Sequence, residues 1–112
     1  MEENVLKGLI KNLTQKLNIG EPDKETLTLL EDELIDAESE VLLELNLDEV
    51  PSDCIPFVVD LAAVYYRYDV MNGCCGFPQV GRPLEPSEYQ KEIRRVLQDV
   101  RQRWDSVLRC QR

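Results

Sequence analysis

The sequence predicts an all-α protein, a small four-helix bundle-like domain with a long central apolar helix and a long C-terminal helix. Apolar residues recur at helical spacing in three segments, while a fourth segment near the middle of the chain is apolar on every side. A helix of the second kind has no solvated face, so other elements must surround it. The 112 residues suffice for one domain with one core, and we expect residues 1–112 to form it.

The central apolar segment spans residues 53–71. Ser52 or Asp53 is suited to cap its first turn, and Gly73 provides a left-handed stop. Its valines and aromatic residues would also suit a buried strand. The length from cap to stop and the Leu-Ala-Ala sequence at 61–63 favour the helix.

Amphipathic spacing predicts the other helices and one long loop: residues 3–18, 24–45 and 87–109, with the loop at 72–86. Gly20 is expected to end the first of these helices, and Asp23 and Asn46 to cap the two ends of the second. Ser87 and Gln90 have the spacing of a capping box at the start of the last helix.

The helix predicted at 24–45 has an irregular apolar face, made of Leu27, Leu30, Leu34, Ile35, Ala37, Val41, Leu42 and Leu45. Glu31 and Glu38 fall within this face, whereas Leu29 and Leu43 fall on the opposite, acidic side with Glu33. Two interpretations stay open. The glutamates can lie at the edge of the core while the first helix covers the two leucines, or Leu29 and Leu43 can mark an interface with another subunit.

The net charge of −9 is divided unevenly along the chain. Residues 1–60 carry 16 acidic residues and 4 lysines, a charge of −12, while residues 61–112 carry 6 acidic and 9 basic residues, a charge of +3. Such asymmetry can serve contact between subunits or with a charged partner, and it can also merely keep a small domain solvated.

The last predicted helix has a basic ridge opposite its apolar stripe, formed by Lys91, Arg94, Arg95, Arg101, Arg109 and Arg112. Asp105 interrupts the ridge. Solvated surface is the commoner explanation of such a pattern, and the functional explanation is binding to an acidic protein surface or to a phosphate backbone.

Residue types that carry chemistry are sparse. The chain has no histidine, and no glycine-rich phosphate loop follows a strand. Cys54, Cys74, Cys75 and Cys110 lack the paired spacing of a zinc site, so we interpret them as reduced thiols. We therefore expect no enzymatic activity, no catalytic residues, no bound metal and no cofactor.

Asp60 is the one charged residue within the apolar run of the central helix. Arg67 lies two turns further on, and we expect the two to form a structural pair in the core.

The start of the chain is amphipathic and acidic, unlike a signal peptide, and the apolar run is shorter than the roughly 20 residues that span a bilayer. These features predict a protein of the cytoplasm, or of an assembly made there, without membrane contact.

Residues 25–73 resemble the core of the head-tail connector proteins (adaptor or head-completion proteins) of long-tailed bacteriophages. The shared features are an acidic helix, a short link with Asn and Pro, and an apolar helix that reads VVDLA. The matching residues are Leu30, Leu34, Ile35, Ala37, Glu38, Val41, Leu42, Asn46, Val50, Pro51, Val58, Val59, Asp60, Leu61 and Ala62. The resemblance covers less than half of the chain and does not extend to residues 74–112.

The resemblance implies a structural virion protein without catalysis, which forms a homo-oligomeric ring between the capsid portal and the tail. Its partners would be the portal protein and the tail or stopper proteins, in the neck of a particle assembled in the host cytoplasm. DNA would pass through the ring without being read by sequence. An alternative from another class is an acidic DNA mimic, or another protein-binding inhibitor of a nucleic-acid enzyme.

The cysteine spacing leads to a first prediction. Neither a chelator nor a reductant should change the melting temperature, because structural zinc contributes directly to folding and no zinc site is expected. Thermal unfolding followed by circular dichroism checks this. A drop of many degrees with chelator alone would mean that the cysteines bind a metal.

Overall fold

The computed structural model describes residues 3–71, 77–78, 82 and 84–111. This part of the chain is helical and contains no strand: α1 (Glu3–Leu17), α2 (Lys24–Leu45), the 3₁₀ turn η1 (Ser52–Cys54), α3 (Ile55–Met71) and α4 (Pro86–Cys110). The prediction of an all-α fold with four helices is confirmed, and each boundary lies within two residues of its expected position.

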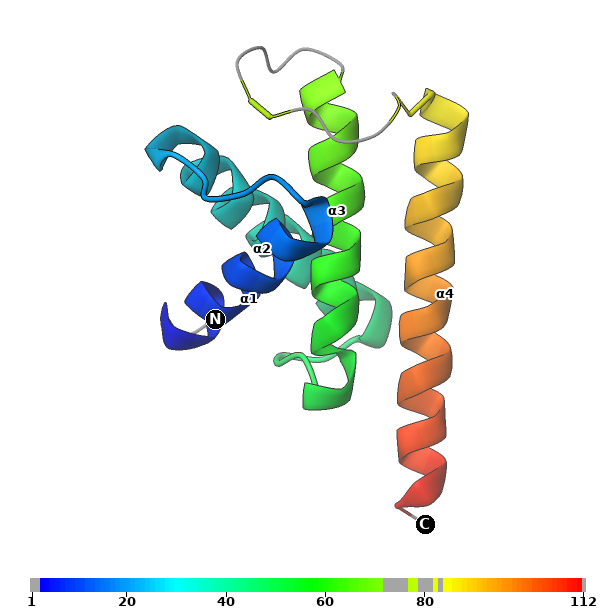
Figure 1. Ribbon diagram of the computed structural model, residues 1–112. Coiled ribbons are helices and arrows are strands. Elements are labelled where there is room, and N and C mark those ends of the chain that lie inside the picture. The colour runs from blue at the N-terminus through cyan, green and yellow to red at the C-terminus, as the bar shows by residue number, and fades with distance from the viewer. Residues whose placement is uncertain (1–2, 72–76, 79–81, 83, 112) are drawn as a thin grey trace.

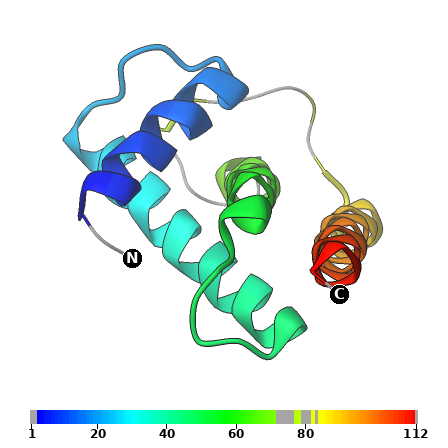
Figure 2. The same cartoon turned by 90° about the horizontal axis from the view of Figure 1, so that it is seen from below.

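The central helix α3 contacts each of the other three helices. Figure 1 shows α1 and α2 crossing it on one side, while α4 runs antiparallel beside it on the other. The view from below in Figure 2 gives the same arrangement, with α3 between α4 and the pair formed by α1 and α2. The last turns of α4 extend beyond the other helices (Figure 1).

The core forms around α3, as its apolar sequence predicts. Residues 61–66 are all buried, and α1, α2 and α4 contribute the side chains that cover them. Tyr66 is the largest fully buried side chain, and its hydroxyl donates a hydrogen bond to the carbonyl oxygen of Pro78 at 2.7 Å. This bond gives the buried hydroxyl a partner and connects the segment after α3 to the core.

The two predicted caps of α2 are confirmed. The Asp23 side chain accepts a hydrogen bond from the backbone N–H of Thr26 at 2.8 Å, and hydrogen bonding by the side chain and the backbone of Thr26 lowers the pKa of Asp23. At the other end, Asn46 adopts φ 55° and ψ 48°, the left-handed conformation that ends many helices.

Three other predicted end signals are wrong, although the helix bounds are close to those expected, and a fourth lies outside the described residues. Helix α1 ends before Gly20, because Asn18 already adopts a left-handed φ of 55°. Helix α4 begins at Pro86, so Ser87 lies inside the helix and forms no capping box with Gln90. The segment from Ser52 begins with a 3₁₀ turn that has no side-chain cap, and Gly73 lies outside the described residues.

The predicted core pair of Asp60 and Arg67 is wrong. Asp60 is partly exposed, and its carboxylate contacts the ammonium group of Lys16 at 2.6 Å. Because α1 packs across α3, it brings Lys16 to Asp60 from far away in the sequence. The Nε atom of Arg67 is buried and has no hydrogen-bond partner in the described part of the chain.

The exposure of Asp60 leads to a stability prediction. Asp60→Ala should lower the free energy of unfolding by less than about 1 kcal/mol, because exposed ion pairs contribute little. Leu34→Ala, at a fully buried position of α2, should cost about 2–5 kcal/mol in the same urea titration. A loss of about 3 kcal/mol on Asp60→Ala would instead indicate a broken buried pair.

Candidate protein-interaction surfaces

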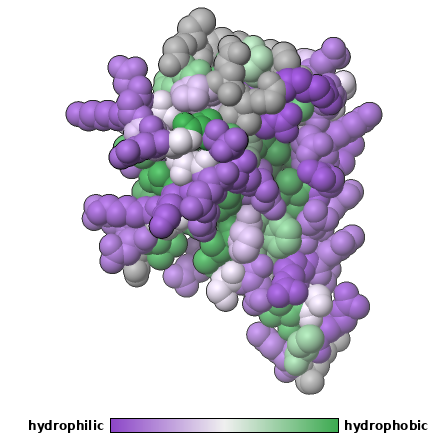
Figure 3. Space-filling view, in the orientation of Figure 1, coloured by the Kyte–Doolittle hydropathy of each residue, from purple (hydrophilic) through white to green (hydrophobic). Residues whose placement is uncertain are grey.

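The basic ridge is exposed on α4 wherever the structure describes it. Lys91, Arg94 and Arg95 are exposed in the first half of the helix, and Arg101 and Arg109 are exposed further along. Arg112 lies outside the described residues. Figure 3 shows hydrophilic side chains along the outer edge of α4, at the right of the view.

Three arginines of the ridge are already engaged within the chain. Arg95 forms an ion pair with Glu92 at 2.6 Å, and the Nε atom of Arg109 donates to the carbonyl oxygen of Asp105 at 3.4 Å. Arg101 donates to the carbonyl oxygen of Glu44 in the last turn of α2. A cation there stabilises a helix end, since the last carbonyl groups of a helix lack partners and carry partial negative charge.

Lys91 and Arg94 therefore differ from the rest of the ridge. Within the described part of the chain, their side chains make no hydrogen bond or ion pair. They lie three residues apart on the first half of α4, on one face of the helix. This pair is the portion of the ridge that a partner can contact without breaking a bond inside the protein.

The two candidate leucines of α2 have different environments. Leu43 is 76% exposed, as predicted for an interface residue. Leu29 is partly buried and packs against the core, so its predicted outward position is wrong. The reason is that α2 packs against both α3 and α4, which places the flank carrying Leu29 and Glu33 inside the molecule.

An exposed apolar strip runs along α2 and was not predicted. Ile35, which the sequence pattern assigned to the core, is 49% exposed. It aligns with Leu42 and Leu43 at the i, i+7 and i+8 spacing of one helix face. We call Ile35, Leu42 and Leu43 the apolar strip of α2.

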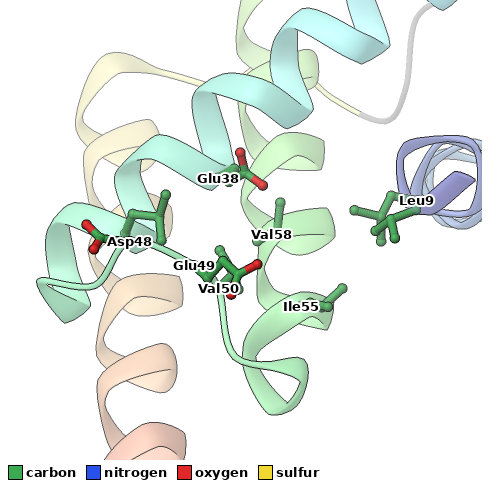
Figure 4. A pocket seen from close by; sticks show the side chains of 9 residues that line it. Leu9, Glu38, Asp48, Glu49, Val50, Ile55 and Val58 are labelled. Atoms are coloured by element: carbon green, nitrogen blue, oxygen red, sulfur yellow. The ribbon is translucent and has the colours of Figure 1, made fainter. Parts of the chain in front are cut away.

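The strip borders a groove of about 590 Å³ between α1, α2, the 46–51 link and the start of α3. Figure 4 shows the residues that line it: Val5, Leu9, Glu38, Leu42, Asp48, Glu49, Val50, Ile55 and Val58. Six of its nine lining residues are apolar, Glu38 of α2 also lines it, and Asp48 and Glu49 are exposed acidic residues of the link. We call this feature the acid-rimmed groove.

A second hollow, the acidic cleft, lies between α2, α3 and α4. It is lined by Glu33, Asp36, Ser39, Glu40, Tyr65, Asp69, Tyr89, Gln90 and Ile93. Tyr89 of α4 stacks on Tyr68 of α3, with ring centroids 3.9 Å apart and an interplanar angle of 17°. This contact holds the first turn of α4 against α3 beside the cleft.

Glu33 lies at the bottom of the acidic cleft and is only 4% exposed. Burial, a hydrogen bond with Asp69 and the charges of Asp69, Asp36 and Asp32 raise the pKa of Glu33 to about 9. The Glu33 carboxyl is therefore protonated at neutral pH and donates to Asp69. Sequence reasoning missed this residue, because its burial depends on the distant helices α3 and α4.

The described residues contain no group of three or more His, Cys, Asp or Glu side chains that could hold a metal ion. Among the cysteines, Cys54 is buried and Cys110 is exposed, and both are free thiols. Burial raises the pKa of the Cys54 thiol. Cys74 and Cys75 lie outside the described residues.

Over the part of the chain that is described, no helix meets the length and hydropathy needed to cross a membrane.

The protonated Glu33 leads to a prediction on pH dependence. The unfolded chain loses this proton near the ordinary pKa of 4.5, whereas the folded protein keeps it up to about pH 9. Between these values the folded state binds more protons, so this carboxyl lowers stability progressively as the pH rises. The glutamine of Glu33→Gln can still donate a hydrogen bond to Asp69, but it does not titrate. The variant should therefore be more stable than the unsubstituted protein by on the order of 2–4 kcal/mol at pH 8.

Urea titrations of both proteins at pH 4, 6 and 8 measure this difference. The advantage of Glu33→Gln should be close to zero at pH 4 and should grow with pH. Glu40→Gln, at an exposed position of the same cleft, is the matched control and should show no such trend. A constant difference at all three pH values would mean that Glu33 is ionised in the folded protein.

No known protein family matches this sequence, and searches of curated proteins and of solved structures found no significant match.

Proposed function

We propose that this protein is a head-tail connector of a tailed bacteriophage, a structural subunit of the ring that joins the capsid portal to the tail. Its role is assembly and not catalysis. The portal protein lies on one side of the ring, and the tail or stopper proteins lie on the other. DNA passes through the centre of the ring and is not read by sequence.

The main support for the proposal is the order of the structural elements that contain the matching residues. The acidic segment is α2, the Asn and Pro link joins it to α3, and the VVDLA sequence lies in the buried first half of α3. All residues of that sequence except Asp60 belong to the core. A small helical domain built around this segment is the architecture that the resemblance implies.

The distribution of charge supports a ring subunit. A closed ring requires two different surfaces on each subunit, which meet head to tail. Lys91 and Arg94 are exposed on α4, whereas Asp48 and Glu49 are exposed on the link that follows α2. Complementary charges of this kind steer association and fix its orientation.

A second candidate is an acidic inhibitor of a nucleic-acid enzyme, and the acidic cleft favours it. Asp36 and Glu40 are exposed carboxylates one turn apart on α2. Carboxylates arranged along a helix can stand in for phosphates on a basic protein surface. The two candidates differ in partner: a connector binds portal rings, and an inhibitor binds a DNA-binding enzyme.

The connector proposal predicts that the exposed part of the basic ridge contributes to assembly. Lys91→Glu with Arg94→Glu should weaken binding to portal rings by about tenfold or more, since each like-charge contact costs on the order of a kcal/mol. Raising the salt concentration on the unsubstituted protein should have a similar effect, because salt screens exposed charges. Arg95 and Arg101 are left unchanged, because their bonds within the chain would be lost.

The measurement is a pull-down with the portal protein encoded in the neighbouring reading frames, with circular dichroism to check helix content. Lys11→Glu with Lys24→Glu changes the net charge equally at exposed positions of α1 and α2, and it is the matched control. Both variants should fold. If both variants bind portal rings equally well at low salt, the basic ridge is not part of the interface. Binding to a DNA-processing enzyme, with none to portal rings, would favour the inhibitor.

A further inference from the structure

The C-terminal end of α4 is an exposed basic and apolar tip. The ion pair between Arg103 and Asp53, at 3.1 Å, ties α4 to η1, and the helix continues for about two further turns. Leu108 is 40% exposed there, beside the partly buried Val107. Figures 1 and 3 show that this end extends beyond the body and carries hydrophobic surface. Arg109 adds a cation in the last turn.

The acid-rimmed groove has the complementary properties. Val5 is 41% exposed and Ile55 is partly buried on its apolar floor, beside Glu38, and Asp48 and Glu49 place two exposed carboxylates on its edge. Leu42 and the 76% exposed Leu43 continue this apolar surface along α2. Large exposed apolar side chains beside a groove are typical of a protein-binding surface.

The tip and the groove cannot meet within one molecule. The groove is formed by α1, α2, the 46–51 link and the start of α3, whereas the last turns of α4 lie beyond these elements (Figure 1). The tip extends away from the body instead of folding over it. Contact between these two surfaces therefore requires a second copy of the chain, and it is heterologous, since the two copies use different surfaces.

We propose that the C-terminal tip of α4 from one copy docks in the acid-rimmed groove of the next. Val107 and Leu108 pack on the apolar floor and on the exposed leucines of α2, while Arg109 lies beside Asp48 and Glu49. The inference rests on the proposed function, because this contact is the one that builds the proposed connector ring. Repeated head-to-tail contact of this kind gives a closed ring or an open filament.

Cysteine crosslinking tests the proposal, because Cys110 is exposed on the tip. The test protein has Cys74→Ser and Cys75→Ser, and Asp48→Cys places a second thiol on the rim of the groove. A short bis-maleimide should then join Cys110 of one copy to the rim thiol of the next. Each copy has one thiol of each kind, so denaturing gels should show dimers, trimers and larger products.

Three control proteins decide the outcome. Without Asp48→Cys, pairing through Cys110 alone can give no product larger than a dimer. Glu21→Cys, which replaces the rim thiol by one at an exposed position outside the groove, should give no ladder. Leu108→Asp, combined with Asp48→Cys, should keep its helix content and melting temperature and reduce the yield of the ladder about tenfold.

A ladder that is equally strong with Glu21→Cys, or that persists with Leu108→Asp, would overturn the proposed contact. So would the absence of any ladder up to millimolar protein. The connector function is judged separately by the portal pull-down. A ladder without portal binding would retain the contact and reject the connector, whereas portal binding without a ladder would retain the connector and reject the contact.

Discussion

The fold depends on one constraint, which is that residues 61–66 of α3 are apolar on every side. Nine of the 17 residues of α3 are buried, and such a helix is stable in water only when other elements cover it all round. Helices α1 and α2 cover one side and α4 covers the other. The acidic α2 and the basic α4 both pack on α3, and they also contact each other.

The features that the sequence predicts well are local. The extent of α2 follows from Asp23 and Asn46, whose conformations depend on residues within a few positions. The burial of α3 follows from its composition. The starts of α3 and α4 were less predictable, because Pro51, Pro86 and their neighbours allow several cap geometries and the chain adopts one without a side-chain bond.

The features that the sequence predicts poorly depend on contacts between distant segments. Spacing along α2 placed Ile35 in the core and Glu33 in solvent, and the packing of α4 against α2 reverses both. Asp60 was paired with Arg67 by helical spacing, whereas its partner Lys16 comes from another helix. Of the candidate interface residues, Leu29 is not exposed as expected, and the others are: Leu43, Lys91, Arg94, Arg95, Arg101 and Arg109. The groove was not predictable, because four separate segments build it.

The bond from Arg101 to the Glu44 carbonyl has a consequence for how the two sides of the molecule communicate. Arg101 is exposed on α4, while Glu44 is in the last turn of α2, directly before the link that carries Asp48 and Glu49. If a carboxylate of another molecule bound Arg101, the C-terminal end of α2 would lose its cation. The 46–51 link would then be held less firmly. Any ligand that competed for Arg101 would therefore be thermodynamically linked to the stability of this end of α2, and such linkage is reciprocal.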